Sequence, residues 1–320
     1  MSIKRDNLLH ILWERSPLSA LTLPPTLSAA EQTRLSWARR VESYEAVPEI
    51  FKDYFAAFQT GERTFPHAVL TPIYEGFLHR AAEKMVCAFD DAIHILERSG
   101  DAFETQCYPL AGISYVEART ILLDSRIRIC GATRQGLPAA STLQFNSVTD
   151  YLFTPILEAI RFVAVGSRGA ARREEQEKFD QWARLSFKFM NYARRSLLGD
   201  EKVIQAILQP EIRTRIFSIL GRAYYRTVAP TLACILTDRE LILIREERMR
   251  GGGKYGGSWL YIPLGKIAAL ALAEKGDDLL EFSVELPQNE RLGFLFQAPV
   301  RQELNQVVER FKGWQSVARN

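Results

Sequence analysis

One segment of the sequence combines basic, aromatic and glycine residues in a pattern that could bind an anion. Residues 250–258 read Arg-Gly-Gly-Gly-Lys-Tyr-Gly-Gly-Ser, and residues 245–258 together hold four basic and two acidic side chains, a net charge of +2. Backbone N–H groups and guanidinium or ammonium groups of such a loop could surround a phosphate or an anionic headgroup. The candidate ligand-binding residues are Arg248, Arg250, Lys254 and Tyr255.

The same loop has a second interpretation. It lacks the Lys-Ser/Thr that ends a Walker loop, and a strand rather than a helix is expected after it, so the dinucleotide-binding glycine pattern does not apply. A glycine-rich hairpin tip that is only solvated has the same composition. The sequence therefore leaves two alternatives open, an anion-binding loop and a solvated hairpin tip.

The residue types that carry out catalysis or bind metals are few and scattered. No two of the four histidines stand three or four residues apart, no Cys/His group has zinc-ligand spacing, and there is no Gly-x-Ser-x-Gly elbow. The adjacent carboxylates Asp90-Asp91 and Asp277-Asp278 fall at expected turns, where aspartate satisfies backbone donors. His94 alternates with two isoleucines, which predicts a solvent-facing or hydrogen-bonded strand histidine. We expect no catalytic residue, no metal and no cofactor.

The elements that must position the glycine-rich loop are short strands followed by a helix. Leu241-Ile242-Leu243-Ile244 is apolar on both faces, so this strand should be covered on both sides. Val300, Leu304 and Phe311 share one face at helical spacing, which predicts a closing amphipathic helix. The expected strands before this helix are 232–237, 240–246, 259–262, 267–272, 279–284 and 292–297.

An earlier part of the chain repeats this order. The expected strands there are 85–90, 92–98, 102–108, 113–118, 126–130 and 142–146, followed by a helix at 150–165. Pro109-Leu110-Ala111-Gly112-Ile113 corresponds to Pro263-Leu264-Gly265-Lys266-Ile267, and Cys87 corresponds to Cys234. Matches that occur in the same order at similar offsets predict a tandem duplication.

These features resemble bacterial pleckstrin-homology-like (PH-like) domains over residues 67–165 and 228–316. The similar features are the hairpin, the Ile-Pro-Leu-x-x-Ile strand from Ile262 to Ile267, a strand with an internal aromatic residue, and the closing helix. The resemblance implies an α+β fold of two PH-like antiparallel β-barrels, each closed by a C-terminal helix and preceded by helical segments. We count six strands in each copy, whereas the family has seven.

The expected organisation has four parts. Residues 1–66 and 169–227 contain apolar residues at helical spacing, which predicts two helical segments. The first PH-like domain is expected at 67–168 and the second at 228–320. Helices within residues 2–15 and 29–60, and from Glu174 to Arg226, would then pack on or between the barrels.

Composition excludes several classes of protein. The 320 residues are 47% hydrophobic and 25% charged, which is typical of a globular chain, and the net charge of +3 is too small to indicate a nucleic-acid binder. The N-terminal residues show no apolar signal core, so export is not expected. The four cysteines are widely spaced, which is typical of reduced thiols. These features favour a cytoplasmic location.

Without a catalytic constellation, the sequence favours a non-catalytic binding or scaffolding role with a protein partner. The alternative is peripheral attachment to anionic lipid through Arg248, Arg250 and Lys254, and this alternative requires binding that weakens with salt. A third hypothesis, an enzyme with a site between the two copies, would need a cleft lined by convergent ionisable groups. Homo-oligomerisation is left open.

Overall fold

The structure, a computed structural model, describes residues 36–58, 64–75, 80–219, 222–248, 253, 255–276 and 278–318. The helix expected within residues 2–15 lies outside this range. None of the described helices is both long enough and apolar enough to cross a membrane. We call residues 36–165 the N-terminal half and residues 173–318 the C-terminal half.

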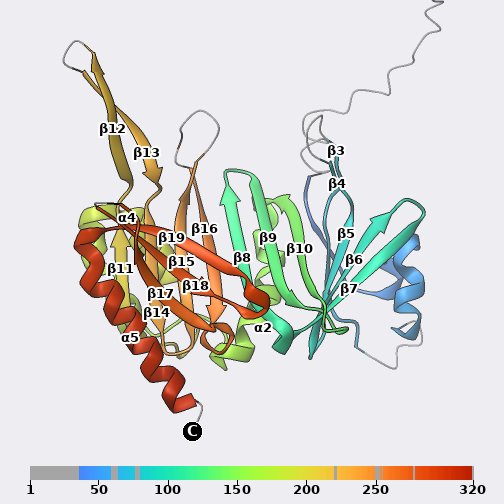
Figure 1. Ribbon diagram of the computed structural model, residues 1–320. Coiled ribbons are helices and arrows are strands. Elements are labelled where there is room, and N and C mark those ends of the chain that lie inside the picture. The colour runs from blue at the N-terminus through green and yellow to red at the C-terminus, as the bar shows by residue number, and fades with distance from the viewer. Residues whose placement is uncertain are drawn as a thin grey trace, which may run out of the picture. The chain divides into compact units, whose positions relative to one another are not determined.

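Most of the described chain forms antiparallel sheets (Figure 1). The first sheet belongs to the N-terminal half and has the order β1-β2-β5-β6-β7. Its strands are β1 (Arg39–Val41), β2 (His67–Leu70), β5 (Lys84–Ala88), β6 (Ala92–Ser99) and β7 (Ala102–Pro109). A small hairpin of β3 (Tyr74–Glu75) and β4 (Arg80–Ala81) stands between β2 and β5 in the sequence.

A seven-stranded sheet with the order β10-β9-β8-β16-β15-β14-β11 joins the two halves. The N-terminal half contributes β8 (Ile113–Ile121), β9 (Asp124–Ala132) and β10 (Pro138–Asn146). The C-terminal half contributes β11 (Val203–Gln209), β14 (Leu232–Thr237), β15 (Glu240–Glu247) and β16 (Gly256–Pro263). The junction is the antiparallel β8–β16 pair, in which Gly256 lies opposite Ile121 and Tyr261 opposite Val116.

The remaining strands form a three-stranded sheet and a two-stranded ribbon. The three-stranded sheet contains β17 (Ala269–Glu274), β18 (Leu279–Glu285) and β19 (Arg291–Gln297). The ribbon contains β12 (Ile212–Ile219) and β13 (Arg222–Ala229), and we call it the arm. The arm extends away from the larger sheets in Figure 1.

Four α-helices and several short 3-10 helices complete the described fold. The α-helices are α2 (Thr154–Val165), α3 (Arg173–Glu177), α4 (Ala183–Ser196) and α5 (Arg301–Ala318). The 3-10 helices are η1 (Tyr44–Ala46), η2 (Glu49–Phe58), η3 (Leu110–Gly112), η4 (Ser147–Leu152), η5 (Asp180–Trp182), η6 (Leu264–Lys266), η7 (Pro287–Asn289) and η8 (Ala298–Val300).

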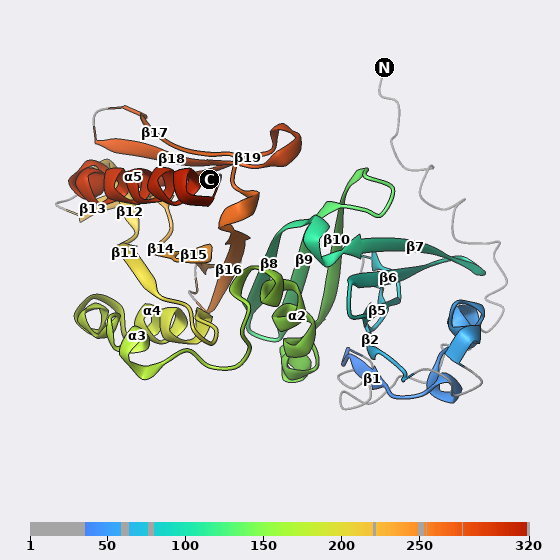
Figure 2. The same cartoon turned by 90° about the horizontal axis from the view of Figure 1, so that it is seen from below.

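Strand β15 lies in the middle of a layered structure. Leu241 and Leu243 belong to the core that contains α5 and the three-stranded sheet, whereas Ile242 and Ile244 belong to the core that contains α2 and α4. Figure 2 shows these layers on opposite sides of β14–β16. Successive strand residues point to opposite faces, so a strand that is apolar at every position is buried on both. The expectation that this strand is covered on both sides is confirmed.

The order of elements is repeated along the chain. In the N-terminal half, β5 to β10 are followed by η4 and α2, and in the C-terminal half, β14 to β19 are followed by η8 and α5. Pro109 and Pro263 end corresponding strands with nearly equal dihedral angles, φ −53° with ψ 134° and φ −56° with ψ 133°. A short 3-10 helix follows each proline. Each strand expected in the two copies overlaps one of these strands.

The expected barrels are absent, because no sheet in the described residues closes on itself. The fold prediction of two PH-like antiparallel β-barrels, each closed by a C-terminal helix, is therefore wrong. Strand β8 already pairs with β9 on one side and with β16 on the other, so it has no edge left with which to close a barrel. Helix α2 packs against β5, β8 and β16, which belong to both halves, instead of closing one of them.

The second expected helical segment is only partly helical. Helices α3 and α4 fall within residues 169–227, but β11, β12 and most of β13 fall there as well. Isoleucine, threonine, tyrosine and phenylalanine favour strands, and Leu220-Gly221 separates two such runs as a hairpin connection does. The apolar residues here also fit helical spacing, which explains the wrong prediction. The predicted domain boundaries themselves stay a prediction.

Gly131 is placed where β9 passes a bulge of β8, and a side chain there would meet backbone. A Cβ on Gly131 would lie 2.4 Å from the carbonyl oxygen of Gly112 and 2.7 Å from the Cα of Ile113. Gly131→Ala should therefore destabilise the protein by about 1–3 kcal/mol. Urea denaturation measures this change.

Gly313 in α5 provides the matched control, because a Cβ there would meet nothing within 4 Å. Gly313→Ala should stabilise the protein by up to about 1 kcal/mol through helix propensity. Equal effects of the two substitutions would contradict the proposed backbone contact.

Candidate functional site

The structure describes two of the four predicted ligand-binding residues. Arg250 and Lys254 lie outside the described residues. Tyr255 is 65% exposed, directly before β16. Arg248 follows β15, forms an ion pair with Glu211, and donates a hydrogen bond from Nη1 to Thr227 Oγ1 at 3.0 Å. The glycine-rich loop is thus linked at its first residue to the base of the arm.

The two strand ends that flank the glycine-rich loop lie beside an exposed turn of the N-terminal half. Glu247, the last residue of β15, pairs with Gly256, and Gly256 pairs with Ile121 at the end of β8. The turn Leu122–Leu123 follows at once and connects β8 to β9. Both leucines are exposed, Leu123 to 58%. The arm, Arg248, Tyr255 and this turn therefore lie at one end of the seven-stranded sheet, and we call them together the rim.

The turn Leu122–Leu123 has an unusual residue for its backbone conformation. Leu122 has φ +52°, in the left-handed region where glycine and asparagine are usual in two-residue hairpin turns. A leucine there costs conformational energy and exposes apolar surface.

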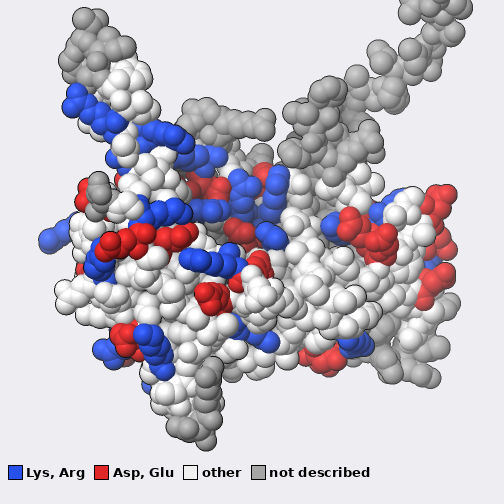
Figure 3. Space-filling view, in the orientation of Figure 1, with Lys and Arg blue, Asp and Glu red and all other residues white. Residues whose placement is uncertain are grey.

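The arm is basic and aromatic. Residues 212–229 contain four arginines and no acidic residue. The ring centroids of Phe217 and Tyr224 lie 4.7 Å apart on one face, and Tyr225 is exposed on the other, opposite Arg215. Figure 3 shows Lys and Arg side chains over the arm and across the face beside it.

One carboxylate anchors the base of the arm. Glu211 forms ion pairs with Arg213, at 2.7 Å, and with Arg248. Arg226 is exposed and forms no ion pair with any other described residue.

Sequence reasoning missed the arm because it read these residues as helical. The signal that could have found it is the alternation of arginine with threonine, isoleucine and tyrosine around Leu220-Gly221.

The rim can bind an anionic surface by two means. Guanidinium groups form charge-assisted hydrogen bonds with phosphate or carboxylate oxygens. Exposed leucine, isoleucine, phenylalanine and tyrosine side chains can enter an apolar environment. The combination requires a partner that is both negatively charged and able to accept apolar side chains.

No protein-family model matches this chain, and neither does any curated protein. The resemblance to PH-like domains therefore receives no support from comparison with known families.

The titratable residues of the N-terminal sheet offer one contact with possible chemistry. His94 Nε2 lies 3.2 Å from Cys107 Sγ on the neighbouring strand, and Tyr54 hydrogen-bonds to Nδ1 of the same ring. Burial raises the pKa of the Cys107 thiol and lowers the pKa of His94, and both shifts oppose a thiolate–imidazolium pair. The expectation of a hydrogen-bonded strand histidine is confirmed.

Cys87 and Cys234 are fully buried. Burial raises the pKa of Cys234 to about 12 and raises that of Cys87 as well, so both remain thiols at neutral pH. No three His, Cys, Asp or Glu side chains of the described residues lie close enough together to hold a metal ion.

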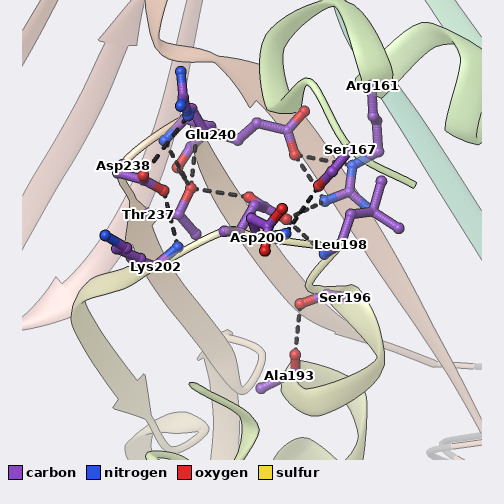
Figure 4. Close-up of polar contacts among 12 residues, drawn as sticks. Arg161, Ser167, Ala193, Ser196, Leu198, Asp200, Lys202, Thr237, Asp238 and Glu240 are labelled. Carbon is purple, nitrogen blue, oxygen red and sulfur yellow. Dashed lines mark hydrogen bonds and ion pairs between the residues drawn. The ribbon is translucent and has the colours of Figure 1, made fainter. Parts of the chain in front are cut away.

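A buried ionic network joins α2 to the C-terminal half (Figure 4). Arg161 Nε donates to Glu240 Oε2 at 2.9 Å, and Arg161 Nη2 donates to Glu201 Oε2 at 3.1 Å. Glu201 also accepts hydrogen bonds from the backbone N–H of Leu198 and from Thr237 Oγ1. The guanidinium lies 3.9 Å from the ring centroid of Tyr261. None of these residues was singled out by sequence reasoning, because they come from four distant segments.

The network holds two carboxyl groups and one guanidinium. Burial raises the pKa of Glu201 to about 7 and raises that of Glu240, while Arg161 acts in the opposite direction on both. Burial also raises the pKa of Tyr261 to about 12, so this phenol stays neutral. Arg161 can balance only one of the two carboxylates. A second buried negative charge would have no cation beside it, so Glu201 and Glu240 together retain one proton to near neutral pH.

This network should make the protein less stable as the pH rises. The unfolded chain releases the Glu201 proton near the ordinary value of 4.5, whereas the folded protein holds it to about 7. Between these values the folded state binds more protons, so the free energy of unfolding decreases with increasing pH. In Glu201→Gln this decrease should be smaller. Urea denaturation from about pH 5 to about pH 8 measures both slopes.

Glu285→Gln, at an exposed position of β18, is the control and should keep the slope of the unchanged protein. Identical slopes in all three proteins would show that the network does not hold a proton in this range.

Proposed function

We propose that this chain is a non-catalytic peripheral membrane protein that attaches to an anionic lipid surface through the rim. The observation that carries the proposal is the convergence of the arm, Arg248, Tyr255 and the turn Leu122–Leu123 at one end of one sheet. Each segment alone has another explanation. Together they bring basic and exposed apolar side chains to the same end of the sheet.

Magnitudes explain why both kinds of side chain are needed. A basic side chain near an anionic membrane contributes about 1 kcal/mol, so the arginines of the arm together contribute about 4 kcal/mol, which corresponds to millimolar affinity. Burying a leucine side chain contributes about 1.5–3 kcal/mol more. Tyrosine is favoured at the boundary between lipid and water. Charge thus brings the rim to the surface, and insertion holds it there.

The sequence favoured a protein partner, and the geometry favours the lipid. Arginine and tyrosine are also common in the centres of protein interfaces, which supports the protein alternative. The two exposed leucines in a strained turn support the lipid, because they project from a hairpin tip instead of forming a continuous flat patch. Anionic lipids line the cytoplasmic leaflet, and the described cysteines are free, so we also propose a cytoplasmic location.

Sedimentation with lipid vesicles tests the proposal. The protein should sediment with vesicles that contain about 30% phosphatidylserine, should not sediment with phosphatidylcholine alone, and should be released by raised salt. Arg213→Ala with Arg226→Ala should weaken binding by about 30-fold, from a loss of about 2 kcal/mol. Leu122→Ser with Leu123→Ser should weaken binding by about 100-fold or more, from a loss of at least about 3 kcal/mol, without removing its salt dependence.

Neutralising the glycine-rich loop by Arg248→Ala, Arg250→Ala and Lys254→Ala should also weaken binding. Arg173→Ala with Arg301→Ala removes two exposed arginines from α3 and α5 and is the matched control, with binding unchanged. If the control variant loses as much vesicle binding as the arm variant, binding depends on the overall charge of the protein and not on the rim. Binding to a DNA duplex, or to a purified protein partner, in place of vesicles would overturn the proposal.

A further inference from the structure

A cavity lies where the three-stranded sheet meets one face of the seven-stranded sheet. Its volume is about 340 Å³, which is within the usual range for sites of small ligands. Residues of β8, β9, β15 and β16 form its floor, and residues at the start of β19 form its side. Figure 2 shows the sheet that contains β19 on one side of β16. None of the described rim residues lines this cavity, so it is separate from the rim.

The strand register places the polar residues of the floor on one face of the sheet. Ser258 in β16 lies opposite Arg119 in β8 and opposite Arg245 in β15. Glu117, two residues before Arg119, lies opposite Arg128 in β9. Opposed residues, and residues two apart in one strand, point to the same face. Residues that are far apart in the sequence therefore converge on one floor.

The charged side chains that line the cavity are three arginines and one glutamate, a net charge of +2. The arginines are Arg128 and Arg245 of the floor and Arg291 of β19. Arg128 is exposed and forms no ion pair with any other described residue. Glu117 Oε1 lies 3.8 Å from Arg245 Nη2. One carboxylate cannot balance three guanidinium groups, so the lining favours an anion.

The carboxylates that hold these arginines from outside the lining are shared with other cations. Glu247 pairs with Arg245 and with Arg119, each at 3.0 Å. Glu281 pairs with Arg291, at 3.7 Å, and with the lysine that follows β17. The Arg245 side chain is 45% exposed and that of Glu247 only 11%. These carboxylates therefore fix the guanidinium groups, and the guanidinium groups face the solvent.

Glu290 is the remaining carboxylate close to the cavity. It accepts a hydrogen bond from Tyr115 Oη at 2.7 Å and does not itself line the cavity. With Glu290 and the shared groups included, there are five cations and four carboxylates, and the net charge is still positive at +1.

A buried hydroxyl group provides an independent observation. Ser258 lines the cavity and is 3% exposed, and its hydroxyl has no hydrogen-bond partner among the described residues. A buried hydroxyl group without a partner costs free energy, because burial removes its water. An anion in the cavity would accept this hydrogen bond and remove the cost.

We propose that this cavity binds a phosphate monoester with a small apolar or aromatic body. Guanidinium groups form charge-assisted hydrogen bonds with phosphate oxygens, and a phosphate group has enough oxygens for several of them and for a serine hydroxyl. Leu260, Leu292 and Phe294 form the apolar part of the lining and would contact the organic body. A free organic phosphate and the headgroup of phosphatidic acid both present this group.

Calorimetric titration tests the proposal with phenyl phosphate as the probe. Phenyl phosphate should bind with one-to-one stoichiometry. Benzoate should bind at least about tenfold more weakly, because it carries less charge and fewer oxygens, and benzyl alcohol more weakly still. Equal binding of benzoate and phenyl phosphate would overturn the assignment of a phosphate group.

Two substitutions test the site itself. Arg128→Ala and Ser258→Ala each remove one hydrogen-bond donor to a charged group and should each weaken binding of phenyl phosphate by about tenfold or more. Arg126→Ala is the matched control. Arg126 stands two residues before Arg128 on the same strand and face, pairs with Asp124, and does not line the cavity. Its loss should leave binding unchanged, and an equal loss in all three variants would contradict the proposal.

Vesicles distinguish the two sources of the phosphate group. If the source is lipid, the protein should bind vesicles with phosphatidic acid more tightly than vesicles of equal surface charge with phosphatidylserine, and Arg128→Ala should remove this difference. If the source is a free organic phosphate, the two kinds of vesicle should bind alike. Attachment through the rim should persist in Arg128→Ala, so the two proposals can fail separately. Absence of heat with both phenyl phosphate and soluble dioctanoyl phosphatidic acid would overturn the proposal.

Discussion

The antiparallel pairing of β8 with β16 is the constraint on which the rest of the described structure depends. It joins strands from the two halves into one seven-stranded sheet. It also occupies the edge of β8 that would otherwise be free to pair with another strand of the N-terminal half and close a barrel. The same pairing brings the turn Leu122–Leu123 beside the start of β16, and thereby assembles the rim. Toward its other end it brings together the corresponding segments Pro109–Ile113 and Pro263–Ile267, and Lys266 Nζ donates a hydrogen bond to the carbonyl oxygen of Ala111. The rim is thus a consequence of this ladder of hydrogen bonds.

The Arg161 network shows a different way of joining the halves. A fully buried ion pair rarely adds stability compared with apolar residues of similar size, because desolvation offsets the attraction. Here the guanidinium of α2 reaches two carboxyl groups and an aromatic ring of the C-terminal half, so only one relative position of the helix satisfies all of them. The network thus specifies how α2 sits on the sheet, and it leaves one oxygen unsatisfied as the cost of that arrangement.

Local patterns predicted the strands well and their partners poorly. Alternation and turn residues located β5 to β10 and β14 to β19, because these signals act within a few residues. The β8–β16 pairing joins residues more than a hundred positions apart, and no local pattern records it. The same applies to the site. The glycine-rich loop could be recognised from its composition. Leu122 and Leu123 could not be distinguished from other apolar residues in the sequence, and no sequence pattern connects Arg161 with Glu240.

The β8–β16 ladder also has a consequence for how this chain reaches its folded state. Strands β8 to β10 can pair with one another as soon as they are synthesised, but the outer side of β8 lacks its partner until Gly256 and the rest of β16 leave the ribosome. At about 5–20 residues per second, this interval lasts on the order of ten seconds. An unpaired strand side is a template for pairing with other chains, so the nascent protein passes through a period of exposure to aggregation that the finished protein does not have.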